Sequence, residues 1–376
     1  MCNVPFDKIY VDATYKERAY ESAFWYVYGL LNLTDSSQFN FAFDGPQDAT
    51  ADSVKDGIEQ LQQKLIFDIN PPENDTVLRF YDACEKYVVS VDDNDTAMYQ
   101  VTDFENTTTF QSSLQLLSDS FCAEGGLCSM NETILSNIYT ACSHAQMMFN
   151  DYAPCEYIPQ EVLETFEYCS DLKVYYKSYR GYNISYTSSC YLTRVITQDI
   201  QKAVKHDIIK RKKADEKECE QFEETAVNHD VTVKTGENEE IGDGSDQVFS
   251  HIVRAAHAET VLPVLGIMDA VYTEPLTADT YSIYRNFHSS RLAPMAANII
   301  FTVYYSPERS QSRKPENSYF DNYFVTILLN ERLLYLDGLN DPLRPNSPVP
   351  YKKFTQFLDT CSIEEFEKMC EETEEL

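Results

Sequence analysis

Positive charge is scarce in this sequence of 376 residues, in which 30 Lys and Arg stand against 61 Asp and Glu, for a formal net charge of −31. Proteins bind a nucleic-acid backbone mainly through clustered Lys and Arg side chains. The shortage therefore argues against nucleic acid as a partner. A small polyanionic substrate stays compatible with this charge if a few basic side chains gather in one pocket within the acidic surface.

Long hydrophobic runs are also missing. No uncharged apolar stretch reaches the ~18 residues that a membrane-spanning helix needs, and the most apolar stretch, Ala296 to Tyr305, has the length of a strand. The opening Met-Cys-Asn-Val-Pro-Phe-Asp-Lys lacks the basic start and apolar core of a secretory signal peptide. We therefore expect neither a membrane span nor a signal peptide in this chain.

Cysteine and asparagine usage nevertheless indicates the secretory pathway, either the endoplasmic reticulum lumen or the outside of the cell. The 11 Cys include no Cys-x-x-Cys pair with a matching Cys or His pair, which favours disulfides over zinc. An odd count leaves one thiol without a partner in the chain. Six Asn-x-Ser/Thr sequons exceed the roughly three expected by chance. A secretory protein without a signal peptide implies that its N-terminal segment is missing. The sequons lie at Asn32, Asn74, Asn94, Asn106, Asn131 and Asn183.

Hydrophobic periodicity predicts an α/β core interrupted by helices. A strand is expected over 8–14, followed by a helix over 15–31, and residues 75–205 show the three- and four-residue spacing of helices. Strands at both ends with helices between them indicate an inserted helical domain. Further strands are expected over 248–254, 298–305, 323–329 and 332–336, and further helices after His257 and over 351–358 and 363–370.

A change of composition marks a boundary inside the chain. The basic run 210–213 is followed by an acidic, Gly-containing run, which is typical of a solvated, mobile insertion. A binding role for the basic run is the alternative. The predicted domains are the first part of the core over 1–70, a helical cap over 71–205, the charged insertion over 206–247 and the return to the core over 248–376.

Three residues occupy positions where chemistry is common. His257 and Glu259 follow a predicted strand and open an apolar helix, and Arg18 lies just after the first predicted strand. Ligands of open α/β sheets bind at this carboxyl edge, where a helix start favours anions. The simpler interpretation is a helix start whose dipole Glu259 complements, with Arg18 as an exposed surface residue.

Several segments resemble multiple inositol polyphosphate phosphatases, within the histidine acid phosphatase superfamily. The resemblance lies in Glu73 to Tyr99, in Asp171 to Cys190, in the run His257-Ala-Glu-Thr-Val-Leu-Pro-Val-Leu-Gly, and in Pro294-Met-Ala-Ala-Asn-Ile-Ile-Phe onward to Leu328-Leu-Asn-Glu-Arg. The close pair Cys361 and Cys370 near the end also fits. These ordered matches cover nearly the whole chain except the charged insertion.

The resemblance implies an α/β fold with two parts. One is a histidine-phosphatase-like core with a mainly parallel sheet, which is incomplete at its N-terminus in this chain. The other is an inserted helical cap. It implies hydrolysis of inositol polyphosphates such as phytate, and in some members of 2,3-bisphosphoglycerate. In this family the reaction proceeds through a phosphohistidine and uses no metal or other cofactor. Arg18 resembles the family's phosphate-binding Arg, His257 its second phosphate-contacting His, and Glu259 the proton donor to the leaving alcohol. Candidates for a basic contribution from the cap are Lys86, Lys173, Lys177 and Arg180.

One departure from the family is decisive. Its nucleophilic His lies in an Arg-His-Gly-x-Arg-x-Pro motif, and no Arg-His-Gly occurs in this sequence. Without an attacking imidazole, phosphoryl transfer to the protein cannot start, so we predict that this chain by itself is inactive. The other five histidines fall in predicted helices, in the insertion, in a strand or in a connection, namely His144, His206, His229, His251 and His288.

Three hypotheses remain open at this stage. The first is a phosphomonoester hydrolase of inositol polyphosphates that lacks its nucleophile segment in this chain. The second is a secreted, inactive pseudophosphatase that keeps Arg18 and His257 and holds phosphorylated ligands without turnover. The third is a structural glycoprotein without a ligand, which the sequons and the acidic charge allow but do not require.

Overall fold

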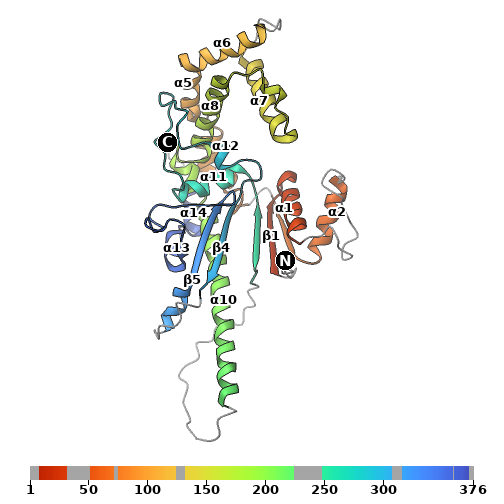
Figure 1. The fold of residues 1–376 in the computed structure, drawn as a ribbon, viewed down its shortest axis with the longest axis vertical. Helices are drawn as coiled ribbons and strands as arrows, with labels where there is room; N and C mark the ends of the chain where they lie inside the picture. The colour runs from red at the N-terminus through yellow and green to blue at the C-terminus, as the bar shows by residue number, and fades with distance from the viewer. Residues whose placement is uncertain are drawn as a thin grey trace.

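A computed structural model describes the fold for residues 8–31, 51–71, 75–123, 132–223, 248–306, 316–358 and 360–371. Two small sheets lie at the middle of an elongated molecule, with helices α5 to α8 at one end and the long helix α10 reaching toward the other (Figure 1).

The first sheet is parallel and has β1 (Ile9–Thr14) between β2 (Ile66–Asn70) and β3 (His251–Ala255). The register pairs Val11 with both Phe67 and Val253. Because all three strands run the same way, their carboxyl ends meet at one edge of the sheet. The strands predicted over 8–14 and 248–254 are confirmed, whereas β2 was not predicted.

Two helices cover one face of this sheet. Ile9, Val11 and Ala13 alternate along β1, so they point to the same side, where they pack with Phe24 and Val27. The predicted helix over 15–31 is confirmed as α1. The two covering helices are α1 (Glu17–Leu30) and α2 (Ala51–Gln62).

The opposite face carries charge. Asp12 and Arg254 are register partners, and Arg254 Nη2 donates to Asp199 Oδ2 of α10 at 2.6 Å. Asp12 Oδ1 accepts from Asn70 Nδ2 at 2.7 Å, and its Oδ2 lies 3.7 Å from Arg254 Nε. The pKa of Asp12 is raised to about 6, mainly by burial and also by the charge of Asp75, while Arg254 opposes the rise. A carboxyl that is costly to ionise thus lies in the central strand.

The second sheet is antiparallel and is built around β5 (Tyr323–Leu329). In the view of Figure 1 its strand β4 (Ile299–Tyr305) lies on the side of β3 that is away from β1. Within the described residues, β3 pairs only with β1 and β4 only with β5. Most side chains of both strands, although largely apolar, are half-exposed. The strands predicted over 298–305 and 323–329 are confirmed, and the shorter members of the sheet are β6 (Arg332–Leu333) and β7 (Val349–Pro350).

Residues 75–205 form helices throughout their described part, as predicted. Their packing is aromatic, since Phe104, Tyr168 and Tyr179 are almost completely buried in the larger of two apolar clusters. The α-helices there are α3 (Phe80–Ala83), α4 (Glu85–Tyr87), α5 (Tyr99–Glu105), α6 (Thr108–Ala123), α7 (Glu132–Phe149), α8 (Gln160–Ser178), α9 (Asn183–Thr187) and α10 (Cys190–Glu223).

Shorter helical turns and the later helices complete the fold. A π-helical turn spans Val88–Asp92, and 3-10 turns span Asp95–Met98, Ala153–Cys155 and Glu316–Asn322. The predicted helices after His257 and near the end of the chain are confirmed as α11 (Ala258–Ile267), α13 (Tyr351–Leu358) and α14 (Ile363–Glu371), and α12 (Ser289–Leu292) is a single turn. No helix in the described part combines the length and apolarity needed to cross a bilayer.

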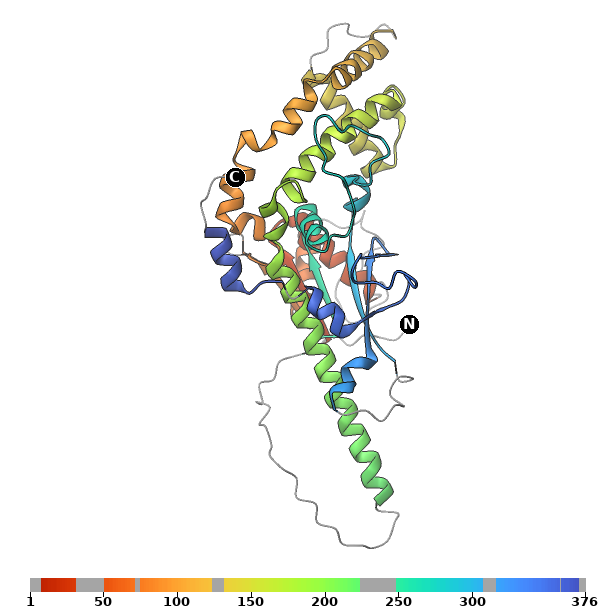
Figure 2. The same cartoon turned by 90° about the vertical axis from the view of Figure 1, so that its left-hand side faces the viewer.

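Helix α10 enters the range that was predicted as a charged insertion. Figure 2 shows it running past the sheets as one long helix. Its basic run contacts β4 and the 3-10 turn before β5, because Arg211 lies 3.6 Å over the Tyr305 ring and Lys212 lies 4.9 Å over the Tyr319 ring. Asp207 pairs with Arg211 one turn earlier. In the described residues this basic run therefore holds α10 against β4, and the rest of the predicted insertion, 224–247, lies outside them.

Disulfides join the end of the chain to the helical part. Cys84 pairs with Cys370 and Cys190 with Cys361, while Cys142 pairs locally with Cys155. The two late cysteines, close in sequence, thus bond to two different earlier segments.

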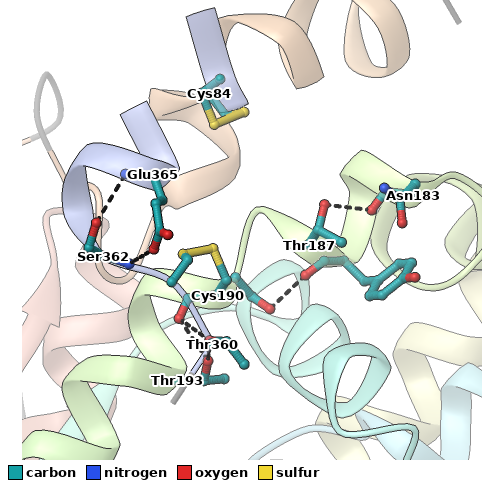
Figure 3. Close-up of a disulfide and its surroundings, with 12 residues drawn as sticks. Cys84, Asn183, Thr187, Cys190, Thr193, Thr360, Ser362 and Glu365 are labelled. Atoms are coloured by element: carbon teal, nitrogen blue, oxygen red, sulfur yellow. Dashed lines mark hydrogen bonds between the residues drawn. A yellow bond between two sulfur atoms is a disulfide. The ribbon is translucent and has the colours of Figure 1, made fainter. Parts of the chain in front are cut away.

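Hydrogen bonds order the segment around Cys361, from Thr360 to the start of α14 (Figure 3). Thr360 Oγ1 donates to the Cys190 carbonyl at 2.7 Å. Ser362 and Glu365 form a capping box at the start of α14, with Ser362 N–H donating to Glu365 Oε2 at 2.6 Å and Glu365 N–H donating to Ser362 Oγ at 3.2 Å. The C-terminal helix is therefore fixed at both its start and its end.

Candidate functional site

The carboxyl edge of the parallel sheet brings together two residues that are 243 positions apart. Thr14 is the last residue of β1, and His257 follows β3 as the N-cap residue of α11. Thr14 Oγ1 lies 3.1 Å from His257 Nε2, and both residues are buried. Either atom of this hydrogen bond can be the donor, depending on the imidazole tautomer. The contact fixes the plane of the His257 ring at the sheet edge.

Positive charge converges on this ring. Burial lowers the pKa of His257, and Arg18, Arg79 and Lys16 lower it further, while Glu259 acts in the opposite direction. The ring is therefore mostly neutral near pH 7, and it lies in a positive local field. In a chain with a net charge of −31, such a field is suited to a bound anion.

Arg18 reaches this edge from α1. It is exposed in the first turn of the helix, directly after the loop that leaves β1. Lys16 precedes it as the N-cap residue, with its ammonium 4.5 Å over the Tyr15 ring. Arg18 is near enough to His257 for its charge to lower the pKa of the imidazole, and its role in binding stays a prediction.

Arg79 belongs to the same site, and sequence reasoning gave it no role. Its guanidinium lies 5.2 Å from the centres of both the Tyr15 and Tyr81 rings and forms an ion pair with Asp82. The only sequence signal was its place in the segment Glu73 to Tyr99 that carries the family resemblance. Nothing in its local pattern separates it from a surface arginine.

Glu259 is exposed in the first turn of α11 and faces the beginning of the helical part. Its charge contributes to the raised pKa values of Tyr81 and Tyr87, whose largest cause is burial. Glu259 therefore stands between the sheet edge and α3–α4, two residues after the imidazole. A carboxyl group in this position can deliver a proton to a leaving group held beside His257.

The four basic residues predicted in the helical part have other surroundings. Lys177 Nζ lies 2.5 Å from Asp92 Oδ1, and Arg180 forms an ion pair with Asp269. Lys173 is exposed and Lys86 is half-buried. In the described part of the chain, no hydrogen bond or ion pair joins these four residues to the sheet-edge site, so their role in binding stays a prediction.

A second cluster, in the helical part, has the donor atoms of a metal site. Glu167, Asp171 and His288 place one ligand atom each within 4.8 Å of one another. Arg285 already donates to both carboxylates, at 3.1 Å to Glu167 and 2.6 Å to Asp171. A divalent cation would be placed against this guanidinium, so the cluster is better explained as an ion-pair network between α8 and the segment before α12.

Comparison with known proteins gives the family of the chain. Residues 2–330 match the histidine phosphatase superfamily (branch 2). Two curated relatives are similar in sequence, multiple inositol polyphosphate phosphatase 1 of Gallus gallus and that of Homo sapiens. The first is 28% identical over 302 residues, which are 79% of this chain and 57% of the relative. The second is 29% identical over 270 residues, which are 71% of this chain and 47% of the relative. The chain thus spans about half the length of these relatives.

Solved structures share the fold. The phytase from D. castellii is similar with a TM-score of 0.60 and 13% identity, covering 94% of this chain and 58% of the phytase. The multiple inositol polyphosphate phosphatase of Bifidobacterium longum, in complex with inositol hexasulfate, gives a TM-score of 0.53 and 14% identity, covering 93% of this chain and 80% of that protein. The predicted histidine-phosphatase-like α/β fold is therefore confirmed.

Proposed function

Because this chain belongs to the histidine phosphatase superfamily, branch 2, we propose that its sheet-edge site binds the phosphate groups of inositol polyphosphates as part of a phosphomonoester hydrolase. The observation that carries the proposal is the convergence of Arg18, Arg79 and Lys16 on a buried His257 at the carboxyl edge of a parallel sheet. The names of the relatives and of the B. longum complex supply the substrate class.

Each residue has a role that fits its surroundings. Arg18, exposed at the start of α1, supplies N–H donors to phosphate oxygens. His257, held by Thr14, contacts the same phosphate and becomes more basic when that anion is bound. Glu259 has the position of a proton donor to the inositol oxygen that leaves, a step that requires a nucleophile to accept the phosphoryl group as the P–O bond breaks.

The attacking group is the part of the reaction that this sequence does not supply. No Arg-His-Gly occurs in its 376 residues. His251 starts β3, at the opposite end of the strand from His257, and His288 is buried against Glu167. Neither can attack a phosphate held at the carboxyl edge. We therefore propose that this chain by itself binds its ligand without transferring a phosphoryl group.

This absence also favours the second candidate function, a pseudophosphatase that holds phosphorylated ligands. The two candidates share the same binding site and differ only in turnover. Three disulfides and the sequons support a secretory location, lumenal or extracellular, for either.

Binding is measured by isothermal titration calorimetry with inositol hexakisphosphate, and turnover by phosphate release from the same compound. We expect saturable binding, lost in Arg18→Gln and His257→Gln, with no phosphate release. The control Arg332→Gln removes one positive charge from the exposed strand β6 and should bind like the unmodified chain. Binding that survives in Arg18→Gln and His257→Gln would place the anion elsewhere and contradict the proposal.

A further inference from the structure

We propose that Arg79 is a second anion-binding residue of this site, which exchanges its internal partner Asp82 for a phosphate group of the ligand. The inference rests on the proposed function and identifies which side chain outside the sheet and α1 contacts the substrate.

The turn that contains Arg79 is hydrogen-bonded to α11, the helix that begins after His257. The Leu78 carbonyl accepts a hydrogen bond from Thr260 Oγ1 at 2.7 Å. Thr260 lies in the first turn of α11, next to Glu259 and three residues after His257. Leu78 and Thr260 are both buried. Arg79 therefore cannot move away from the sheet edge without breaking a buried contact between the helical part and α11.

Asp75 stabilises the same turn from the N-terminal side through two hydrogen bonds. Its Oδ1 accepts from the Leu78 N–H at 2.7 Å, and its carbonyl accepts from the Arg79 N–H at 3.1 Å. Asp75 is only 4% exposed. The backbone that presents Arg79 is thus fixed on both sides, by Asp75 before it and by Thr260 across the chain.

Two aromatic rings orient the guanidinium itself. Tyr15 and Tyr81 each have their ring centre 5.2 Å from it. Tyr15 directly follows Thr14, the residue that contacts His257. Contacts to ring faces hold the guanidinium plane while its N–H groups point outward in that plane, where carboxylate or phosphate oxygens can accept from them.

In this structure, Asp82 accepts the hydrogen bonds of the Arg79 guanidinium. Arg79 Nε donates to Asp82 Oδ2 at 2.6 Å, and Nη2 is paired with the same oxygen. The Arg79 side chain is 11% exposed, but that of Asp82 is 40% exposed. Water can solvate the partly exposed Asp82 carboxylate when it leaves the pair, whereas a phosphate dianion offers Arg79 more charge and more acceptor oxygens. Ligand binding can therefore displace Asp82 and leave Arg79 in place.

The arrangement also bears on specificity. Arg18 comes from α1, and Arg79 comes from the turn before α3, so the two reach His257 from different elements. One small anion can satisfy Arg18 and His257 alone. A ligand with neighbouring phosphate groups can engage both arginines, which favours polyphosphorylated ligands over inorganic phosphate.

Calorimetry with inositol hexakisphosphate at fixed ionic strength tests whether a phosphate replaces Asp82 as the partner of Arg79. Substitutions of Arg79 and of Asp82 should change the affinity in opposite directions. We expect Arg79→Gln to weaken binding about tenfold and Asp82→Asn to strengthen it several-fold, because the internal competitor is gone. Inorganic phosphate, measured in parallel, should be affected by Arg79→Gln less than about twofold.

Matched controls exist in the chain. Arg211→Gln removes an arginine with the same kinds of partner, an aspartate one turn away and a tyrosine ring, at α10. Asp321→Asn removes an ion-paired aspartate that faces Lys352 at 3.0 Å. Both controls should leave binding unchanged, and circular dichroism should show that each variant folds.

The outcomes separate the two proposals. If Arg79→Gln behaves like Arg211→Gln, or if Asp82→Asn fails to strengthen binding, the inference is wrong while loss of binding in Arg18→Gln still supports the function. If the unmodified chain does not bind inositol hexakisphosphate at all, the proposed function itself fails.

Discussion

The buried carboxyl of Asp12 makes a prediction about stability that can be worked out from the structure. In the native chain the pKa of Asp12 rises from 3.8 to about 6, mainly because burial disfavours the charged form. The native state therefore holds this proton between about pH 4 and pH 6, where the unfolded chain has lost it. Asp12 stabilises the fold at low pH, and this contribution is lost as pH rises through about 6.

Replacing Asp12 by Asn removes the titration while keeping an oxygen that can accept from Asn70. A rise from 3.8 to about 6 corresponds to roughly 3 kcal/mol at about 1.36 kcal/mol per pH unit. Relative to the unmodified chain, Asp12→Asn should thus gain roughly 3 kcal/mol in free energy of unfolding between about pH 3.5 and pH 7. A cost of burying the amide would shift the difference equally at every pH.

Urea unfolding followed by circular dichroism, with the disulfides intact, measures both proteins across this range. Other titrating groups are common to the two, so their effects cancel in the difference. Two stability curves that stay parallel from low to neutral pH would refute the reasoning, because they would mean that Asp12 ionises in the native chain as easily as in the unfolded one.

Three further predictions concern the site and its support. Affinity for inositol hexakisphosphate should rise as pH falls from neutral to mildly acidic, because the bound anion favours the charged His257 ring whose pKa is lowered in the free protein; calorimetry should show this slope flattened in His257→Gln. Thr14→Val should lower the free energy of unfolding by about 1–3 kcal/mol, since it leaves His257 Nε2 without its buried partner; an unchanged urea midpoint would contradict this. Replacing Cys84 and Cys370 by Ser should cost about 3–5 kcal/mol in the same assay, because their disulfide joins residues 286 positions apart; a loss below ~1 kcal/mol would show that the unfolded chain is constrained by other means.

Local patterns placed Arg18, His257 and Glu259 near strand ends, and the family resemblance suggested their roles. Arg18 and His257 each follow an apolar strand, and the strands are neighbours in one parallel sheet. Their meeting therefore depends only on the general geometry of such sheets. The same reasoning gave Glu259 its place at the start of α11.

Arg79 could not be found in this way. Its approach to the site depends on the contact between the Leu78 carbonyl and Thr260, residues 182 positions apart. The stacking on Tyr15 likewise joins two distant segments. No periodicity or motif within one segment encodes such contacts.

Ion pairs between distant segments also could not be predicted for the basic residues of the cap. Lys177 and Arg180 were predicted as basic residues available to a ligand, and the structure pairs them with Asp92 and Asp269. In a chain with twice as many acidic as basic residues, a carboxylate from a distant segment can pair with such a cation once the chain folds. Strand β2 was missed because it is a short edge strand without regular alternation of buried and exposed residues.

The most direct test of the central claim is to observe the His257 ring itself while ligand is added. The sequence has six His, and loss of one imidazole signal in His257→Gln assigns the resonance in a proton–nitrogen NMR spectrum. We predict that inositol hexakisphosphate shifts the His257 signals and moves their titration to higher pH, while the other histidines keep theirs. Signals of His257 that stay unchanged at saturating ligand would contradict the account, because the anion would then bind away from the sheet edge.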